Sequence, residues 1–171
     1  MAIDFNQNYF QLFELENSFD VNYESLEKKY LSFQKSFHPD KFVNASDQEK
    51  RISLQIISYI NEAYETLKND YLKSIYLLKI NGYEIDDQNT TISDPDFLMH
   101  QMELREELEE IEKSESTELK KIFLEKINKH KIDCLNDFKE YFNKNFYDEA
   151  SKKVKEMKFY ISIENEIVRM D

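Results

Sequence analysis

Glycine and proline are scarce in this sequence, and tryptophan is absent. The 171 residues include one glycine and two prolines. Turn-rich β folds and nucleotide-binding α/β folds need glycine at tight turns and phosphate loops, so this scarcity argues against a P-loop or Rossmann-type site. Glutamate, lysine, leucine and glutamine are plentiful and form helices well. With 40% apolar residues a packed core is available, and the sequence predicts an all-α fold.

Cysteine and basic residues are also in short supply. The single cysteine, Cys134, permits no intramolecular disulfide, and the first ten residues resemble neither a signal peptide nor a transit peptide, so we expect a cytoplasmic protein. The apolar runs are too short to span a bilayer. Lysine and arginine number 23 against 35 acidic residues, for a net charge of −12. A nucleic acid or an anionic membrane would need a basic surface, so we expect neither as a partner.

Apolar spacing predicts seven helices. Leu26, Tyr30, Phe33 and Phe37 recur on one face of the second helix, which Pro39 ends. The third helix begins after Ser46, and we place Ile52, Ile56, Tyr59, Ile60, Ala63 and Leu67 on its core face. The other predicted ranges are about 8–15, 22–37, 70–80, 94–113, 116–143 and 147–169.

A segment without helical period divides the chain. Residues 82–93 contain many turn formers and follow a helix stop at Asn81-Gly82. We therefore predict a first domain over 1–81, a linker over 82–93 and a second domain over 94–171. Short connections between the last three helices indicate an antiparallel three-helix bundle.

The tripeptide His38-Pro39-Asp40 lies in the loop between two amphipathic helices, after Phe37 and before Lys41. Together with NYFQLFEL, KKYLSFQKSFHPDK and INEAYETL, this loop makes residues 8–80 resemble the J domain. The resemblance implies a helical hairpin that presents the tripeptide to the ATPase domain of a DnaK/HscA-type chaperone. Nothing near His38 suggests proton chemistry, since no nucleophile or glycine-rich turn accompanies it. We expect a non-enzymatic protein.

Lysines accompany the tripeptide on the preceding helix. On a helical wheel Lys28 and Lys35 point away from the apolar face, and Lys29 lies to one side. The J-domain resemblance implies that basic residues of this helix dock on the chaperone. The expected chaperone-binding set is His38, Pro39, Asp40, Lys28, Lys29, Lys35 and Lys41.

The helix over 94–113 carries two different faces. Phe97, Leu104, Leu108 and Ile111 form its core stripe, and a second side runs from apolar residues into carboxylates. In the last helix Ala150, Val154, Met157, Ile161 and Val168 share one face, and Phe159 points nearly opposite. Periodicity alone leaves open whether the residues off these stripes bind a partner or pack against the first domain.

The segment DPDFLMHQMELREELEEIE resembles the scaffold-binding helix of the HscB family, J proteins of iron–sulfur cluster assembly, and Met102 stands where we expect leucine in that family. This resemblance implies that the bundle binds the scaffold protein IscU and delivers it to HscA. The implied contact residues are Leu98, Met99, Met102, Glu103, Glu106, Glu110 and Phe159.

His130 and Cys134 are four residues apart, a spacing that metal ligands can have. Both fall on an apolar stripe with Leu119, Ile127 and Tyr141, so we predict core residues and expect neither zinc, an iron–sulfur cluster nor another cofactor. Three other interpretations stay open: a J protein with a different client, a metal-dependent hydrolase using His38 and Asp40, and a helical structural protein. The oligomeric state is also open, with a monomer favoured.

Overall fold

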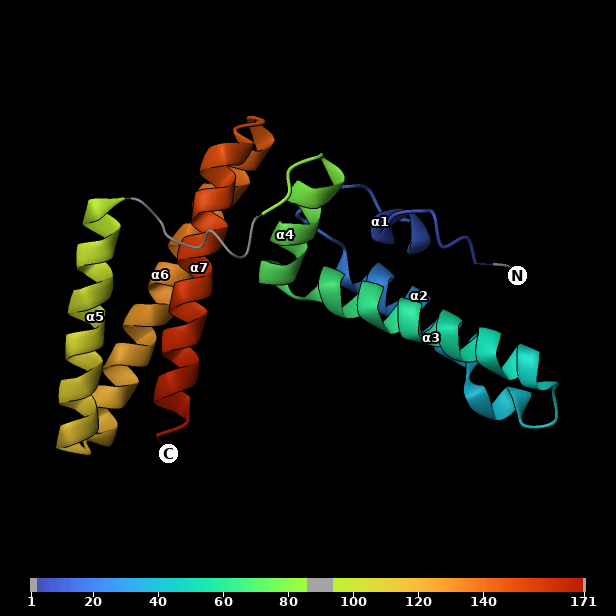
Figure 1. Cartoon of the computed structure of the whole chain (residues 1–171), viewed down its shortest axis with the longest axis horizontal. Coiled ribbons are helices and arrows are strands. Elements are labelled where there is room, and N and C mark those ends of the chain that lie inside the picture. The colour runs from blue at the N-terminus through green and yellow to red at the C-terminus, as the bar shows by residue number, and fades with distance from the viewer. Residues whose placement is uncertain (1–2, 86–93, 171) are drawn as a thin grey trace. The chain divides into compact units, whose positions relative to one another are not determined.

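The computed structural model describes residues 3–85 and 94–170, and all regular structure in these ranges is helical, as predicted. The chain forms two compact units, Met1–Asn81 and Gly82–Asp171. In the described ranges no helix is long and apolar enough to cross a membrane. The first unit holds α1 (Tyr9–Leu12), α2 (Tyr23–Phe37), the 3₁₀ helix η1 (Pro39–Phe42), α3 (Asp47–Lys68) and α4 (Asp70–Ile80). The second holds α5 (Pro95–Ser114), α6 (Thr117–Asn143) and α7 (Tyr147–Val168) (Figure 1).

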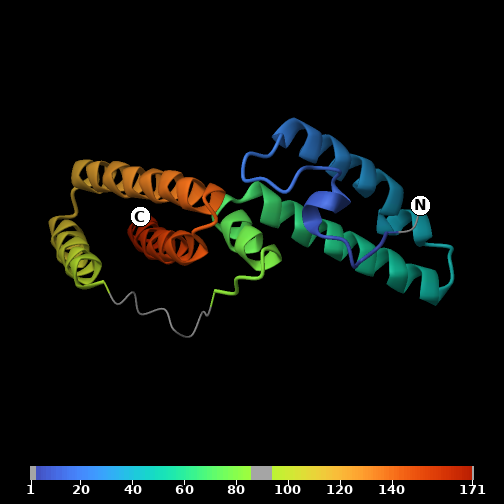
Figure 2. The same ribbon diagram turned by 90° about the horizontal axis from the view of Figure 1, so that it is seen from above.

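Helices α2 and α3 form an antiparallel hairpin, and both views show them side by side (Figures 1 and 2). Leu26 and Phe33 of α2, and Ile60 and Ala63 of α3, are buried in its core as their periodicity predicts. Ile52 was predicted in this core but is 45% exposed. It lies near the start of the longer helix α3, in a shallow apolar pocket shared with η1 and the N-terminal segment. Ile52 is one of the residues that line this pocket, so part of its side chain faces open space.

The helix ends follow the capping residues. Ser46 and Glu49 form the predicted capping box at the start of α3: the Glu49 backbone N–H donates to Ser46 Oγ at 3.3 Å, and the Ser46 N–H donates to Glu49 Oε2 at 2.9 Å. Asn69 ends α3 and begins α4, because its side chain accepts from the Leu72 N–H at 3.0 Å. Beyond α4, Gly82 has φ +81°, a left-handed conformation that favours glycine.

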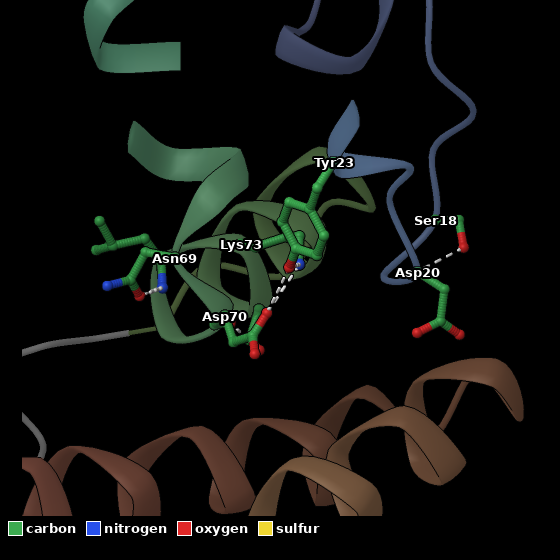
Figure 3. Close-up of polar contacts among 8 residues, drawn as sticks. Ser18, Asp20, Tyr23, Asn69, Asp70 and Lys73 are labelled. Carbon is green, nitrogen blue, oxygen red and sulfur yellow. Dashed lines mark hydrogen bonds and ion pairs between the residues drawn. The ribbon is translucent and has the colours of Figure 1, made fainter. Parts of the chain in front are cut away.

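A fully buried lysine joins α4 to the start of α2. The Lys73 ammonium donates to Tyr23 Oη at 2.7 Å and to Asp70 Oδ1 at 2.9 Å (Figure 3). It also lies 4.3 Å from the centre of the Phe19 ring and 4.9 Å from that of Tyr23. A buried charge is tolerated when it is paired and hydrogen-bonded, and here carboxylate, hydroxyl and ring faces together replace water. Lysine is rarely fully buried, so the apolar spacing of α4 does not predict this residue in the core.

The second unit is an antiparallel arrangement of three helices in which α6 and α7 make the most extensive contact. Phe123, Ile127, Cys134 and Phe138 of α6 are buried against α7. Leu119, which was predicted on this stripe, is 45% exposed because it lies in the first turn of α6. Tyr141 is half-buried. Tyr83 also belongs to this unit, since its hydroxyl lies 3.2 Å from that of Ser151 in α7. Residues 86–93 of the predicted linker lie outside the described residues.

The core face predicted for α7 is correct only in its first half. Ala150, Val154 and Met157 are buried, but Ile161 is half-buried and Val168 is 55% exposed. In the second half the buried residues are Tyr160, Ile163 and Ile167. The reason is that α5 reaches only part of α7: Phe97, in its first turn, packs on Phe159 and Tyr160. From that level onward the buried side of α7 rotates to meet a second helix.

Candidate functional site

The His38-Pro39-Asp40 loop has a defined geometry at the tip of the hairpin. His38 ends α2 with φ −57° and ψ 132°, the extended conformation that a following proline favours. Pro39 starts η1, where its missing N–H costs nothing. The Asp40 N–H donates to His38 Nδ1 at 3.3 Å, and the Lys41 N–H donates to the His38 carbonyl at 3.0 Å. Local hydrogen bonds and the proline ring therefore fix the loop.

The polar side chains of this loop face solvent. The side chain of His38 is 52% exposed and that of Asp40 is 86% exposed, with 3.4 Å between Nδ1 and Oδ2. Phe37, directly before them, is buried. The Asp40 carboxylate does not cap α3, because Ser46 performs that role. The loop thus presents a histidine and a carboxylate whose contribution to the core is small.

The lysines of α2 divide into two groups. Lys28 and Lys35 are exposed, as the wheel predicts. Lys29 instead has a side chain that is 23% exposed, forms an ion pair with Glu14 and lies 5.5 Å from the centre of the Phe33 ring. It holds α2 against the turn after α1. Lys41 is exposed beside Asp40.

The INEAYETL segment of α3 positions the hairpin. Asn61 Oδ1 accepts from Gln34 at 2.6 Å and from Tyr30 at 3.1 Å, both on α2. The Tyr64 ring stacks on Tyr30, with 3.9 Å between ring centres and 13° between planes. These contacts fix α2, and with it the loop, relative to α3.

The same segment also anchors α1. Glu62 accepts from Tyr9 Oη at 2.8 Å, and burial together with this carboxylate raises the pKa of the Tyr9 hydroxyl well above its ordinary value. Tyr9 stacks on Tyr76 of α4 with 4.3 Å between ring centres. A tyrosine, a carboxylate and a stacking partner thus hold the short helix in place.

Helix α5 separates core from surface as predicted. Its core residues Phe97, Leu104, Leu108 and Ile111 are all buried. On another side Leu98 is 40% exposed, Met99 61% and Met102 63%. The carboxylates that continue this side are exposed at Glu103, Glu106 and Glu110. We call these six exposed residues the α5 face. It places flexible apolar side chains next to a row of negative charge.

Phe159 of α7, predicted to point away from the core face of its helix, is only partly exposed. Its ring meets Phe97 edge to face at 5.8 Å and Tyr160 at 5.5 Å between centres. The guanidinium of Arg105 lies 5.7 Å from its centre and 3.5 Å from Glu166 Oε2. Phe159 is therefore partly a packing residue between α5 and α7.

Arg105 also lies beside the α5 face, although it was not among the residues predicted from the sequence. It follows Met102 by three positions and Leu98 by seven, so the three share one side of α5. That spacing is the sequence feature from which Arg105 could have been predicted beside the α5 face. Arg105 places a positive charge at the apolar end of the otherwise acidic α5 face. Its guanidinium contacts the Phe159 ring there.

His130 and Cys134 have the surroundings of packing residues. Burial and the neighbouring Glu156 raise the pKa of the Cys134 thiol to about 12, and Sγ lies 3.5 Å from Glu156 Oε2. His130 stacks on Tyr160 with 5.0 Å between ring centres, and burial and His100 lower its pKa. A thiol that keeps its proton is a poor metal ligand. Within residues 3–85 and 94–170, no three His, Cys, Asp or Glu side chains are grouped to hold a metal ion.

An antiparallel helical hairpin with an exposed His-Pro-Asp loop at its tip, followed by a separate helical unit, defines a J-type co-chaperone. Comparison with known proteins gives the family. The model of the HSCB C-terminal oligomerisation domain matches residues 93–168. The co-chaperone protein HscB homolog of Aliivibrio salmonicida is 35% identical over 165 residues, 96% of each chain, and that of Shewanella halifaxensis is 35% identical over 169 residues, covering 96% of this chain and 97% of the relative. The chain belongs to the HscB co-chaperone family.

Solved structures agree with this assignment. Chaperone HscB from Vibrio cholerae has a TM-score of 0.84 and 32% identity, covering 95% of this chain and 96% of its own. Human co-chaperone HscB has a TM-score of 0.91 and 29% identity, covering 99% of this chain and 84% of its own. These likenesses extend over both units.

Proposed function

We propose that this protein stimulates the ATPase of an HscA/DnaK-type chaperone and delivers an IscU-type iron–sulfur scaffold protein to it. The observation that carries the first half is the exposed His38-Pro39-Asp40 loop, which local hydrogen bonds hold at the end of the α2–α3 hairpin. Lys28, Lys35 and Lys41 supply positive charge on an otherwise acidic protein, and attraction to an acidic patch on the chaperone orients the encounter. The protein itself performs no chemistry in this account.

The second half of the proposal concerns the α5 face. Leu98, Met99 and Met102 expose apolar area that a monomer gains nothing from exposing, and the acidic row beside them favours a partner with basic residues around an apolar groove. Phe159 and Arg105 border this area, so they extend the contact onto α7. Membership in the HscB family favours the scaffold as that partner.

The direct test of the client is a binding titration with a purified IscU-type scaffold protein. Replacement of Leu98, Met99 and Met102 by alanine should weaken scaffold binding by more than about tenfold, because interface energy is concentrated in a few apolar anchors. The matched control is Ile122→Ala with Ile132→Ala, which removes exposed apolar side chains from α6 and should leave the affinity unchanged. If the protein stimulates the ATPase but binds no scaffold, it is a J-type co-chaperone with a different client.

A further inference from the structure

Helix α2 exposes a leucine on the side that faces away from the core of the first unit. Leu31 is 57% exposed, more than any other leucine of the chain. The buried residues of this helix are Leu26, Phe33 and Phe37. At about 100° per residue, Leu31 lies on the far side of the helix from all three. The periodicity that builds the α2–α3 hairpin therefore gives Leu31 no place in its core.

Leu31 shares its side of α2 with the exposed lysines. Lys28 lies three residues before Leu31 and Lys35 four residues after it, so successive turns carry a positive charge, an apolar side chain and a second positive charge. We call Lys28, Leu31 and Lys35 the α2 stripe. His38 follows Leu31 by seven residues, about two helical turns, so the stripe leads to the His38 loop. Within the described parts of the chain neither lysine forms an ion pair, which leaves both charges available to a partner.

Helix stability gives no reason for a leucine at this position. Leucine and lysine have similar helix propensities, so a lysine would form the helix equally well without placing an apolar side chain in water. Single apolar residues are common on protein surfaces, but this one lies between two charges of the proposed chaperone contact. Protein interfaces are apolar at the centre and polar around it, and the α2 stripe has that arrangement.

We propose that Leu31 is the apolar anchor of the chaperone-docking surface and contacts an apolar side chain that acidic groups surround on the ATPase domain of the HscA/DnaK-type chaperone. This inference rests on the proposed function, which supplies the partner, and it adds a residue to the basic set predicted from the sequence. Lys28 and Lys35 orient the encounter through long-range attraction. Leu31 contributes binding free energy because its side chain leaves water.

The two kinds of contact respond differently to salt. Attraction between exposed charges weakens as salt screens them, whereas burial of an apolar side chain is not screened. Docking therefore retains a part that depends on Leu31 and persists at high salt. A chaperone with acidic groups but a polar side chain opposite Leu31 would lack this part. Leu31 thus selects between chaperones of similar charge.

Substitution of Leu31 by lysine distinguishes an apolar contact from a purely basic surface. Leu31→Lys adds a third positive charge to the α2 stripe and changes the net charge from −12 to −11. If the chaperone surface opposite Leu31 were only acidic, this variant would dock more tightly than the wild type at low salt. An apolar contact predicts weaker docking, because the lysine ammonium would have to leave water without a partner.

The measurement is the concentration of this protein that gives half-maximal ATPase stimulation of a purified HscA/DnaK-type chaperone. Leu31→Lys and Leu31→Ala should each raise that concentration by about three- to tenfold, as expected for the loss of an apolar anchor. The effect of Leu31→Ala should be the same at low and at high salt. The maximal rate should not change, because the His38 loop is intact.

Two variants serve as controls. Leu31→Met keeps an apolar side chain of similar volume and should keep wild-type docking. Leu72→Ala removes an exposed leucine from α4 of the same unit and should also leave docking unchanged. Because Leu31 is exposed, its variants should keep the melting temperature within about 2 °C. A change in docking without a change in stability is the result that a packing role would not give.

Three results would overturn the inference: wild-type docking by Leu31→Ala, tighter docking by Leu31→Lys, or an effect of Leu31→Ala that disappears at high salt. The proposed function fails in a different way, since the wild type itself would then not stimulate the chaperone. If the wild type stimulates it and Leu31→Ala docks equally well, only the role of Leu31 is wrong.

Discussion

At the tip of the α2–α3 hairpin, neighbouring residues have different roles: some pack in the core and others expose their side chains to solvent. Phe37 is buried, whereas the side chains of His38 and Asp40 face solvent one and three positions later. Pro39 makes this division possible, since it ends α2 and starts η1 at a fixed backbone angle. The same division separates Lys29, which packs on Phe33, from the exposed Lys28 beside it.

The two groups of lysines should respond differently to mutation. We expect Lys28→Glu or Lys35→Glu to raise the concentration needed for half-maximal ATPase stimulation by roughly three- to tenfold at low salt, since each reverses an exposed docking charge. The effect should shrink as salt is added. Lys29→Glu is the matched control: it replaces the ion pair with Glu14 by repulsion, so it should lower the melting temperature and change docking less. Equal effects of all three on docking would contradict the division.

Cys134 should be unreactive in the folded protein. A pKa of about 12, against 9.0 for an ordinary thiol, lowers the thiolate fraction near pH 8 by about a thousandfold, and the side chain is buried as well. Iodoacetamide should therefore modify it only after unfolding. The pKa of the thiol is higher in the folded protein than in the unfolded chain, so its ionisation leaves the free energy of unfolding unchanged below about pH 9. Between about pH 9 and about pH 12 the thiol loses its proton only in the unfolded chain, and the free energy of unfolding falls as the pH rises. The melting temperature of Cys134→Ser should fall less over that range; an equal fall would remove the thiol as the cause.

The ends and the buried faces of single helices are the features that the sequence predicts best in this protein. Local chemistry determines their ends: Pro39 stops α2, Ser46 and Glu49 start α3, and Gly82 follows α4 in a left-handed conformation. The periodicity of α5 correctly separates its core from its exposed side, because that helix has one buried stripe. The exposure of Leu98, Met99 and Met102 follows from that pattern.

The features that the sequence did not predict are those in which burial depends on contacts with other helices. The buried side of α7 rotates where α5 begins to cover it, so Ile163 replaces Val168 in the core. Phe159 is covered by Phe97 from another helix, which no wheel of α7 can show. Lys73 is buried because Tyr23 and Asp70 from two elements replace its water. Each miss arises from a tertiary contact and not from local propensity.

Stability measurements should separate the α5 face from the packing residue beside it. The triple variant Leu98→Ala, Met99→Ala, Met102→Ala should keep its melting temperature within about 2 °C, because these side chains are exposed. Phe159→Ala should cost about 1–2 kcal/mol in a denaturant titration, less than a fully buried phenylalanine, because its ring is partly covered by Phe97 and Tyr160. A large stability loss in the triple variant would mean that these residues pack inside the protein and are unavailable to a client.

At the scale of the whole molecule, the chain joins two units with different surfaces. Met1–Asn81 presents the His38 loop with exposed lysines near it, and Gly82–Asp171 presents the α5 face with its carboxylates. The two surfaces share no residue, which is compatible with the two partners of the proposed function. Against the net charge of −12, the exposed lysines of α2 form a local region of positive charge.

The most direct test of this account is the steady-state ATPase rate of a purified HscA/DnaK-type chaperone with wild type or His38→Gln. The wild type should raise the rate, and should raise it further when the IscU-type scaffold is added. His38→Gln should give no stimulation under either condition, yet keep its melting temperature and bind the scaffold with unchanged affinity, because His38 is exposed and distinct from the α5 face. Stimulation by His38→Gln equal to that of the wild type would contradict the assignment of this loop as the activating site.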